Sequence, residues 1–128
     1  MASRSETEKM LAGEPYNIFD PGLDAMRQKT KDLLRHFNSA AGLPERQAVL
    51  QQLLGQTGRD SIIEPPFYCV YGQNIYIGDH VYLNVLCTIL DCNEVRIGHH
   101  VMVGPAVQIY TAAHPLEDRL RLDPAQAE

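Results

Sequence analysis

The second half of the chain repeats every six residues. Residues 75–110 divide into IYIGDH, VYLNVL, CTILDC, then NE, then VRIGHH, VMVGPA and VQIY. Small or aliphatic side chains fill one column of this repeat at Ile75, Val81, Cys87, Val95, Val101 and Val107, and a second at Ile77, Leu83, Ile89, Ile97, Val103 and Ile109. A helix cannot produce a period of six. Such a period, with small residues at the corners, is typical of a β-helix in which three sixes complete one coil. The alternative is a β-sandwich whose spacing repeats by accident.

The first half of the chain predicts helices. Ser5 and Glu8 have the spacing of a capping box, and Asp20 followed by Pro21 is a helix start signal. Apolar side chains then recur at spacings of three and four, and Gly42 is expected to end that helix. We expect helices near 6–12, 21–40 and 44–54. The chain then divides into a helical N-terminal cap (residues 1–58) and a β-helix (residues 59–128), with about two coils over residues 59–112.

Length and composition exclude several classes of protein. With 128 residues the chain is one domain, and its net charge of −5 without a basic cluster excludes a nucleic-acid partner. No apolar run approaches the roughly 20 residues that span a membrane, and the N-terminus lacks the apolar core of a signal peptide, so we expect a cytoplasmic protein. The three cysteines lack C-x-x-C spacing, which indicates reduced thiols and not a zinc or disulfide site.

Several longer segments resemble one enzyme family. EKMLAGEPY, LLRHFN, EPPFYCVYGQNIYIG, VYLNVLCTILDCNEVRIG and VQIYTAAHPL, within residues 6–118, are similar to the maltose/galactoside O-acetyltransferases, which are hexapeptide-repeat enzymes. The resemblance implies a left-handed parallel β-helix behind a small helical cap, assembled as a homotrimer. It also implies the transfer of an acetyl group from acetyl-CoA to a sugar hydroxyl, without a metal.

The resemblance also implies roles for individual residues. His114, in the TAAHP segment, matches the catalytic base, and a neutral imidazole can accept a hydroxyl proton near neutral pH. Asn84 matches the residue that meets the acceptor, Tyr82 the residue beside the reacting group, and Asp91 a retained acidic residue near the sugar. Alternatives remain for each of these three: a corner residue for Asn84, packing between trimer faces for Tyr82, and binding of corner amides for Asp91. The residues that bind acetyl-CoA are not identified.

The chain departs from the family pattern at its sugar contacts and at its end. Val70 replaces a serine of the galactoside enzyme, and Cys92 replaces one of its acidic sugar contacts. The acidic contact of the helical cap aligns near residues 17–18, with Asp20 the nearest carboxylate. The sequence therefore predicts acetyl transfer, but it does not predict which sugar accepts the acetyl group. Because family members continue through further coils beyond PAQAE, we expect a truncated or partner-completed chain.

Two other functions compete with acetyl transfer. The first is a zinc enzyme of the γ-carbonic-anhydrase type, which shares the β-helix fold. Its candidate zinc ligands in this chain are His80, His99 and His100. Adjacent residues of a strand point to opposite sides, so only one of His99 and His100 could join a given zinc site. The other alternative is a module that trimerises without turnover. Such a module would not retain acetyl-CoA.

Overall fold

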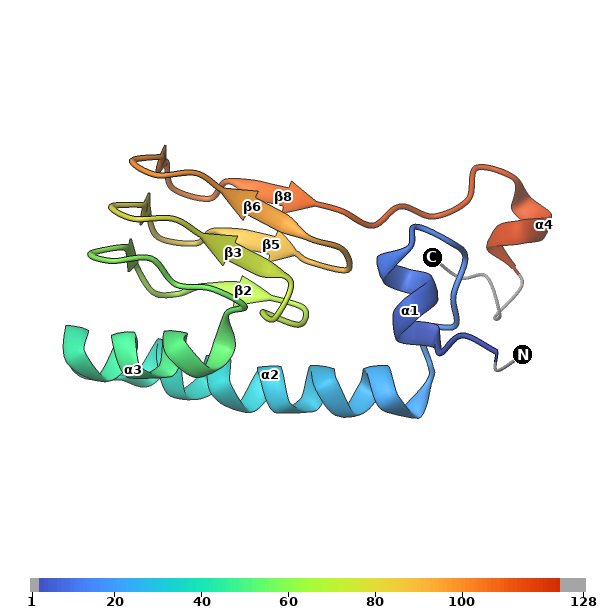
Figure 1. Ribbon diagram of the computed structural model, residues 1–128, viewed down its shortest axis with the longest axis horizontal. Coiled ribbons are helices and arrows are strands. Elements are labelled where there is room, and N and C mark those ends of the chain that lie inside the picture. Colours follow the sequence, from blue (N-terminus) through green and yellow to red (C-terminus); the bar gives the residue numbers. More distant parts are fainter. Residues whose placement is uncertain (1–2, 123–128) are drawn as a thin grey trace.

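The computed structural model describes residues 3–122, in which three helices precede a stack of parallel strands (Figure 1). The helices are α1 (Glu6–Leu11), α2 (Pro21–Ser39), α3 (Leu43–Leu53) and α4 (Asp118–Arg121). The strands are β1 (Ile62–Ile63), β2 (Tyr68–Cys69), β3 (Ile75–Ile77), β4 (Tyr82–Leu83), β5 (Thr88–Leu90), β6 (Val95–Ile97), β7 (Met102–Val103) and β8 (Gln108–Tyr110). The helices expected near 6–12, 21–40 and 44–54 are confirmed to within one residue at each end, and α4 was not predicted.

The helix starts follow the local chemistry of the sequence. The Ser5 hydroxyl accepts the backbone N–H of Glu8 at 3.2 Å, and the Glu8 carboxylate accepts the N–H of Ser5 at 2.7 Å, which completes the capping box. Asp20 caps α2 by accepting the N–H of Leu23 at 3.1 Å. The prediction for Gly42 was wrong, because α2 already ends at Ser39 and Gly42 is the N-cap of α3.

The strands form a parallel β-helix, as the period of six predicts. They make three parallel sheets in the orders β1-β4-β7, β2-β5-β8 and β3-β6. Each residue pairs with the one 20 positions further on, as in Ile62↔Tyr82 and Tyr82↔Met102. A coil therefore holds three sixes and two extra residues. The extra pair Asn93–Glu94 that interrupts the sequence pattern lies in the turn between β5 and β6.

Both aliphatic columns point into the interior of the solenoid. The most deeply buried column residues, at most 2% exposed, are Ile75, Ile77, Val81, Leu83, Cys87 and Ile89. The helices α2 and α3 cover the first coil from below (Figure 1), and the Phe37 ring meets Phe67 edge-to-face with centroids 6.3 Å apart. In the third coil Val101 and Val107 are each 38% exposed, because no further coil lies over them within residues 3–122.

Several corners of the coils use left-handed backbone. Asp60, His80 and His100 occupy the same corner in successive coils with φ of 56°, 55° and 61°. Asp and His adopt this conformation more readily than most residues. The rings of His80 and His100 stack with centroids 5.0 Å apart, so these two successive corners are in direct contact.

The chain leaves the solenoid after β8. Residues 111–117 run as an extended arm past α1 and lead into α4 (Figure 1). The arm therefore places the last part of the described chain beside its beginning. Among the described residues, no helix combines the length and apolar character needed to cross a membrane.

Candidate active site

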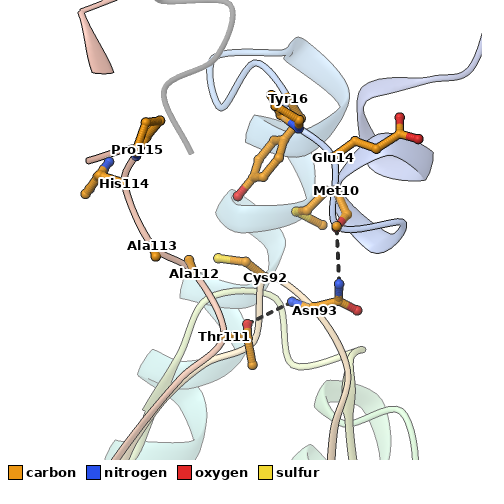
Figure 2. Close-up of a pocket in the computed structure, with 12 residues that line it drawn as sticks. Met10, Glu14, Tyr16, Cys92, Asn93, Thr111, Ala112, Ala113, His114 and Pro115 are labelled. Atoms are coloured by element: carbon orange, nitrogen blue, oxygen red, sulfur yellow. Dashed lines mark hydrogen bonds between the residues drawn. The ribbon is translucent and has the colours of Figure 1, made fainter. Parts of the chain in front are cut away.

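A cavity of about 290 Å³ lies between the arm and the N-terminal segment (Figure 2). It is lined by residues 10, 13–16, 92–93 and 111–115, which come from α1 and its following loop, from the turn after β5, and from the arm. Its size is just below the range of roughly 300–1,000 Å³ that is usual for small-molecule sites.

Thr111 fixes the base of the arm. Its hydroxyl donates to the carbonyl oxygen of Leu90 at 2.7 Å and accepts the backbone N–H of Asn93 at 2.9 Å. Its own N–H donates to the same Leu90 carbonyl at 3.1 Å. These bonds join the start of the arm to the coil below, so the position of the following residues depends on the solenoid.

Asn93 fixes the opposite wall. Its side-chain amide donates to the carbonyl oxygens of Met10 at 3.3 Å and Leu11 at 3.2 Å, at the end of α1 (Figure 2). Its amide oxygen accepts the N–H of Glu94 at 2.8 Å. Asn93 therefore forms hydrogen bonds with both the arm and the end of α1, and these bonds set the distance between the two walls of the cavity.

The floor of the cavity is mostly apolar and also carries the Tyr16 hydroxyl. Met10, Tyr16 and Cys92 are 3%, 5% and 8% exposed and pack in one cluster with Leu23 and Tyr71. In Figure 2 the Tyr16 ring extends from the α1 side toward the arm, and the Cys92 thiol lies between the two walls. The cluster is separate from the main core of the solenoid.

His114 borders the cavity from the arm, and its side chain is exposed (Figure 2). Pro115 follows it and also lines the cavity, which restricts the backbone that carries the imidazole. An imidazole at the rim of a small cavity can take a proton from a hydroxyl group bound inside it. Figure 2 shows the imidazole on the side of the arm away from Tyr16 and Cys92, so the role of His114 as general base stays a prediction.

Within one chain, the structure does not bring Asn84 and Tyr82 to this cavity. Tyr82 lies on β4 and Asn84 at the following corner, both half-buried. The Asn84 amide oxygen accepts the N–H of Val85 at 2.8 Å, which is the bond expected of a corner residue. Their predicted roles toward the acceptor therefore stay predictions that need a second copy of the chain.

Asp91 directly precedes Cys92 in the chain and is fully buried. One carboxylate oxygen accepts the N–H groups of Val70 at 3.0 Å and Tyr71 at 2.9 Å. The other has no partner among the described residues. Burial raises the pKa of Asp91, while the hydrogen bonds from Tyr71 and Val70 act in the opposite direction. Its contact with an acceptor stays a prediction, and the structure adds an internal role in holding the loop before β3.

Four residues that line the cavity could not be identified from the sequence: Met10, Tyr16, Asn93 and Thr111. Asn93 carried a signal, since it interrupts the period of six. The histidines of the zinc alternative have internal contacts: His99 Nδ1 accepts the N–H of Asp79 at 2.8 Å, and His80 stacks on His100.

Comparison with known proteins gives consistent matches. The family model for the maltose acetyltransferase hexapeptide capping motif matches residues 9–58. The chain is 47% identical over 115 residues to nodulation protein L of Rhizobium meliloti, a match that covers 88% of this chain and 63% of that protein. It thus spans less than two thirds of this relative's length.

Two solved structures have the same fold. A maltose O-acetyltransferase from Clostridium difficile is 38% identical with a TM-score of 0.91, over 94% of this chain and 65% of that one. A galactoside acetyltransferase in complex with coenzyme A is 31% identical with a TM-score of 0.88, over 93% of this chain and 60% of that one.

Proposed function

Because the chain belongs to the maltose/galactoside O-acetyltransferase family of hexapeptide-repeat proteins, we propose that it transfers an acetyl group from acetyl-CoA to a sugar hydroxyl. The observation that carries the proposal is the position of His114 at the rim of the cavity. A relative of known structure binds coenzyme A, which supports acetyl-CoA as the donor. The proposed site of the reaction is the cytoplasm, where acetyl-CoA is available as a donor.

His114 acts as the general base in this proposal. Its imidazole takes the proton of the acceptor hydroxyl while the hydroxyl oxygen forms a bond to the thioester carbonyl carbon. The tetrahedral intermediate then breaks its carbon–sulfur bond, and the leaving thiolate receives the proton from the imidazolium. Holding hydroxyl and thioester together beside His114 supplies the remaining acceleration.

The proposal includes a homotrimer with a left-handed solenoid, as the family resemblance implies. The outer face of the β1-β4-β7 sheet carries Ile62, Tyr82 and Met102 in one ladder, and Met102 is 79% exposed. This apolar ladder suits the interface of a closed three-fold assembly. A neighbouring copy can then bring Asn84 and Tyr82 to the cavity beside His114, where the Asn84 amide would orient the acceptor hydroxyl.

The test compares His114→Ala and His114→Gln with His36→Ala, a control histidine that bonds to Glu45 on the helices. With acetyl-CoA and glucosides, maltose or galactosides as acceptors, we expect the His114 variants to lose at least about a hundredfold in kcat, with little change in acceptor KM. Donor binding, measured by calorimetry, should stay unchanged in both His114 variants. Unchanged turnover in the His114 variants would show that His114 is not the general base. A wild-type chain that assembles but binds no acetyl-CoA would favour the non-catalytic trimerisation module.

A further inference from the structure

A groove separate from the cavity lies between helix α2 and strand β2. It has a volume of about 600 Å³ and is lined by Lys31, Leu34, Arg35, Asn38, Ser39 and Tyr68. The Asn38 amide donates to the carbonyl oxygen of Phe67 at 3.0 Å and accepts the N–H of Phe67 at 2.8 Å. This pair of bonds fixes α2 against the start of β2, so the α2–β2 groove is a preformed feature of the surface.

The α2–β2 groove combines apolar surface with positive charge. Leu34 belongs to the main core, and the Tyr68 ring beside it is 52% exposed. Arg35 pairs with Asp32 on the same helix, whereas Lys31 pairs with no carboxylate of residues 3–122. The groove therefore suits a hydrophobic group that is accompanied by negative charge.

Phe19 is a hydrophobic group that a fixed loop holds in solvent. It is 69% exposed, the highest value for an aromatic side chain among the described residues. The loop is held by two hydrogen bonds: the N–H of Phe19 donates to the Asn17 side-chain oxygen at 3.0 Å, and the Arg27 guanidinium donates to the carbonyl oxygen of Ile18 at 2.6 Å. An aromatic ring kept outward on a fixed loop is typical of a contact with another molecule.

Two carboxylates accompany the Phe19 ring. Asp20 follows it directly, and Asp24 lies exposed one helical turn later. The loop thus has the chemistry that the α2–β2 groove suits. Because a helix rises about 1.5 Å per residue, the groove begins roughly 15 Å beyond Pro21. Phe19 cannot reach the groove of its own chain, so its partner is the groove of another copy.

Both surfaces lie at the same level of the molecule. The Phe19 loop leads directly into α2, the groove runs beside α2, and α2 lies along the base of the solenoid (Figure 1). Rotation about an axis parallel to the solenoid keeps each feature at its level, so the loop of one copy can meet the groove of the next. A contact between two different surfaces closes into a ring when the rotation is one third of a turn.

We propose that Phe19 of one copy occupies the α2–β2 groove of a neighbouring copy, with Asp24 facing Lys31, and that this contact closes the trimer. The inference rests on the homotrimer of the proposed function and adds the surfaces that hold it together. Each copy supplies a loop on one side and a groove on the other.

The first test measures self-association of the 128-residue chain by sedimentation velocity over a concentration series. Phe19→Ala should raise the concentration at which half of the trimer dissociates by at least about tenfold, with an unchanged circular dichroism spectrum. Lys31→Glu should also weaken association, and adding Asp24→Lys to it should restore association by re-forming the pair with reversed charges. Lys29→Glu is the matched control, because Lys29 is exposed on α2 outside the groove, and it should associate like the wild type.

The second test joins the two surfaces covalently. The double variant Phe19→Cys/Ser39→Cys, treated with oxidised glutathione, should give covalent trimers on a non-reducing gel. Gln28→Cys/Ser39→Cys is the control, because Gln28 lies on α2 outside both the loop and the groove, and it should give none. The three native cysteines are present in both variants.

The outcomes separate this contact from the proposed reaction. A wild-type trimer that neither Phe19→Ala nor Lys31→Glu weakens, or a double variant that forms no covalent trimer, overturns the inference alone. Covalent polymers longer than three chains overturn the closed ring. Covalent trimers that carry out no acetyl transfer support the contact and overturn only the reaction. A wild type that stays monomeric at every concentration overturns the contact and the homotrimer together.

Discussion

The backbone N–H of Asn93 donates to the hydroxyl oxygen of Thr111 at 2.9 Å, and this bond joins the turn after β5 to the first residue of the arm. Because Asn93 also holds the end of α1, the two walls of the cavity share one anchor. The separation between His114 and the Met10–Tyr16 side therefore depends on a turn that contains no proposed catalytic residue.

Replacing Thr111 by valine tests this anchor. Valine keeps the shape but removes the hydroxyl, which leaves the Asn93 N–H without its partner and should lower the free energy of unfolding by about 1–2 kcal/mol. Displacement of the arm should also lower acetyl transfer, by about tenfold. Urea unfolding and steady-state kinetics measure the two effects. Thr88→Val on the outer face of β5 is the control. Equal losses in both variants would contradict the role of the bond.

Asp91 predicts a specific dependence of stability on pH. Burial raises its pKa above the ordinary value of 3.8, so the stability it contributes is complete below that value and is lost as the pH rises through the folded-state pKa. In Asp91→Asn the amide oxygen can still accept both N–H groups. We expect this variant to remain close to the wild type near neutral pH and to become less stable than the wild type as the pH falls.

Asp91→Ala is the matched comparison, because it leaves the N–H groups of Val70 and Tyr71 without acceptors. We expect it to lose about 2 kcal/mol near neutral pH. Denaturant unfolding at several pH values measures both variants. An Asp91→Asn variant as unstable as Asp91→Ala would show that the carboxylate charge is needed and that the desolvation argument is wrong.

Gly58 and Gly98 occupy the same place in different coils and should respond differently to alanine. A Cβ on Gly58 would overlap the carbonyl oxygen of Gly78 in the next coil, whereas a Cβ on Gly98 would meet nothing within 4 Å. We expect Gly58→Ala to lower the free energy of unfolding by about 2 kcal/mol or more and Gly98→Ala to change it by less than about 0.5 kcal/mol. Thermal unfolding of the two variants measures the difference. Similar midpoints would mean that the backbones at Gly58 and Gly78 are not in close contact.

A mixing experiment tests whether one site uses two copies of the chain. His114→Ala and Asn84→Ala are each expected to be weakly active alone. If Asn84 acts on a hydroxyl bound beside His114 of a neighbouring copy, random mixed trimers formed by refolding the two variants together should regain about one quarter of the intact sites. Activity assays before and after mixing give the result. No recovery, with mixed trimers shown by mass spectrometry, would place both residues in the same chain's site or in no shared site.

The solenoid was predictable because its packing repeats in the sequence. Stacked coils require the same kind of side chain at each column position, so Ile77, Leu83 and Ile89 identify one interior column without any knowledge of the structure. The helices were predictable from local caps such as Asp20. The end of α2 was not, because Gly42 can equally end one helix or begin the next.

Only the arm side of the cavity could be predicted from the sequence. His114 lies at the end of a regular pattern and is part of a recognisable segment, so it could be named. Met10 and Tyr16 lie about a hundred residues earlier, and no period connects them to the arm. Their place beside His114 follows from the Asn93 amide on α1, which is a tertiary contact without a local signature.

The Asn93–Met10 bond also has a consequence for the order of folding. Partners in adjacent coils are 20 residues apart, whereas this bond joins residues 83 apart. Since closing a longer loop costs more entropy, each coil can form on its predecessor before α1 is in place. We therefore expect the cavity beside His114 to be the last feature to form during synthesis and the first to open in the native state. Native-state hydrogen exchange should show residues 10–16 opening at lower free energy than β3 and β5.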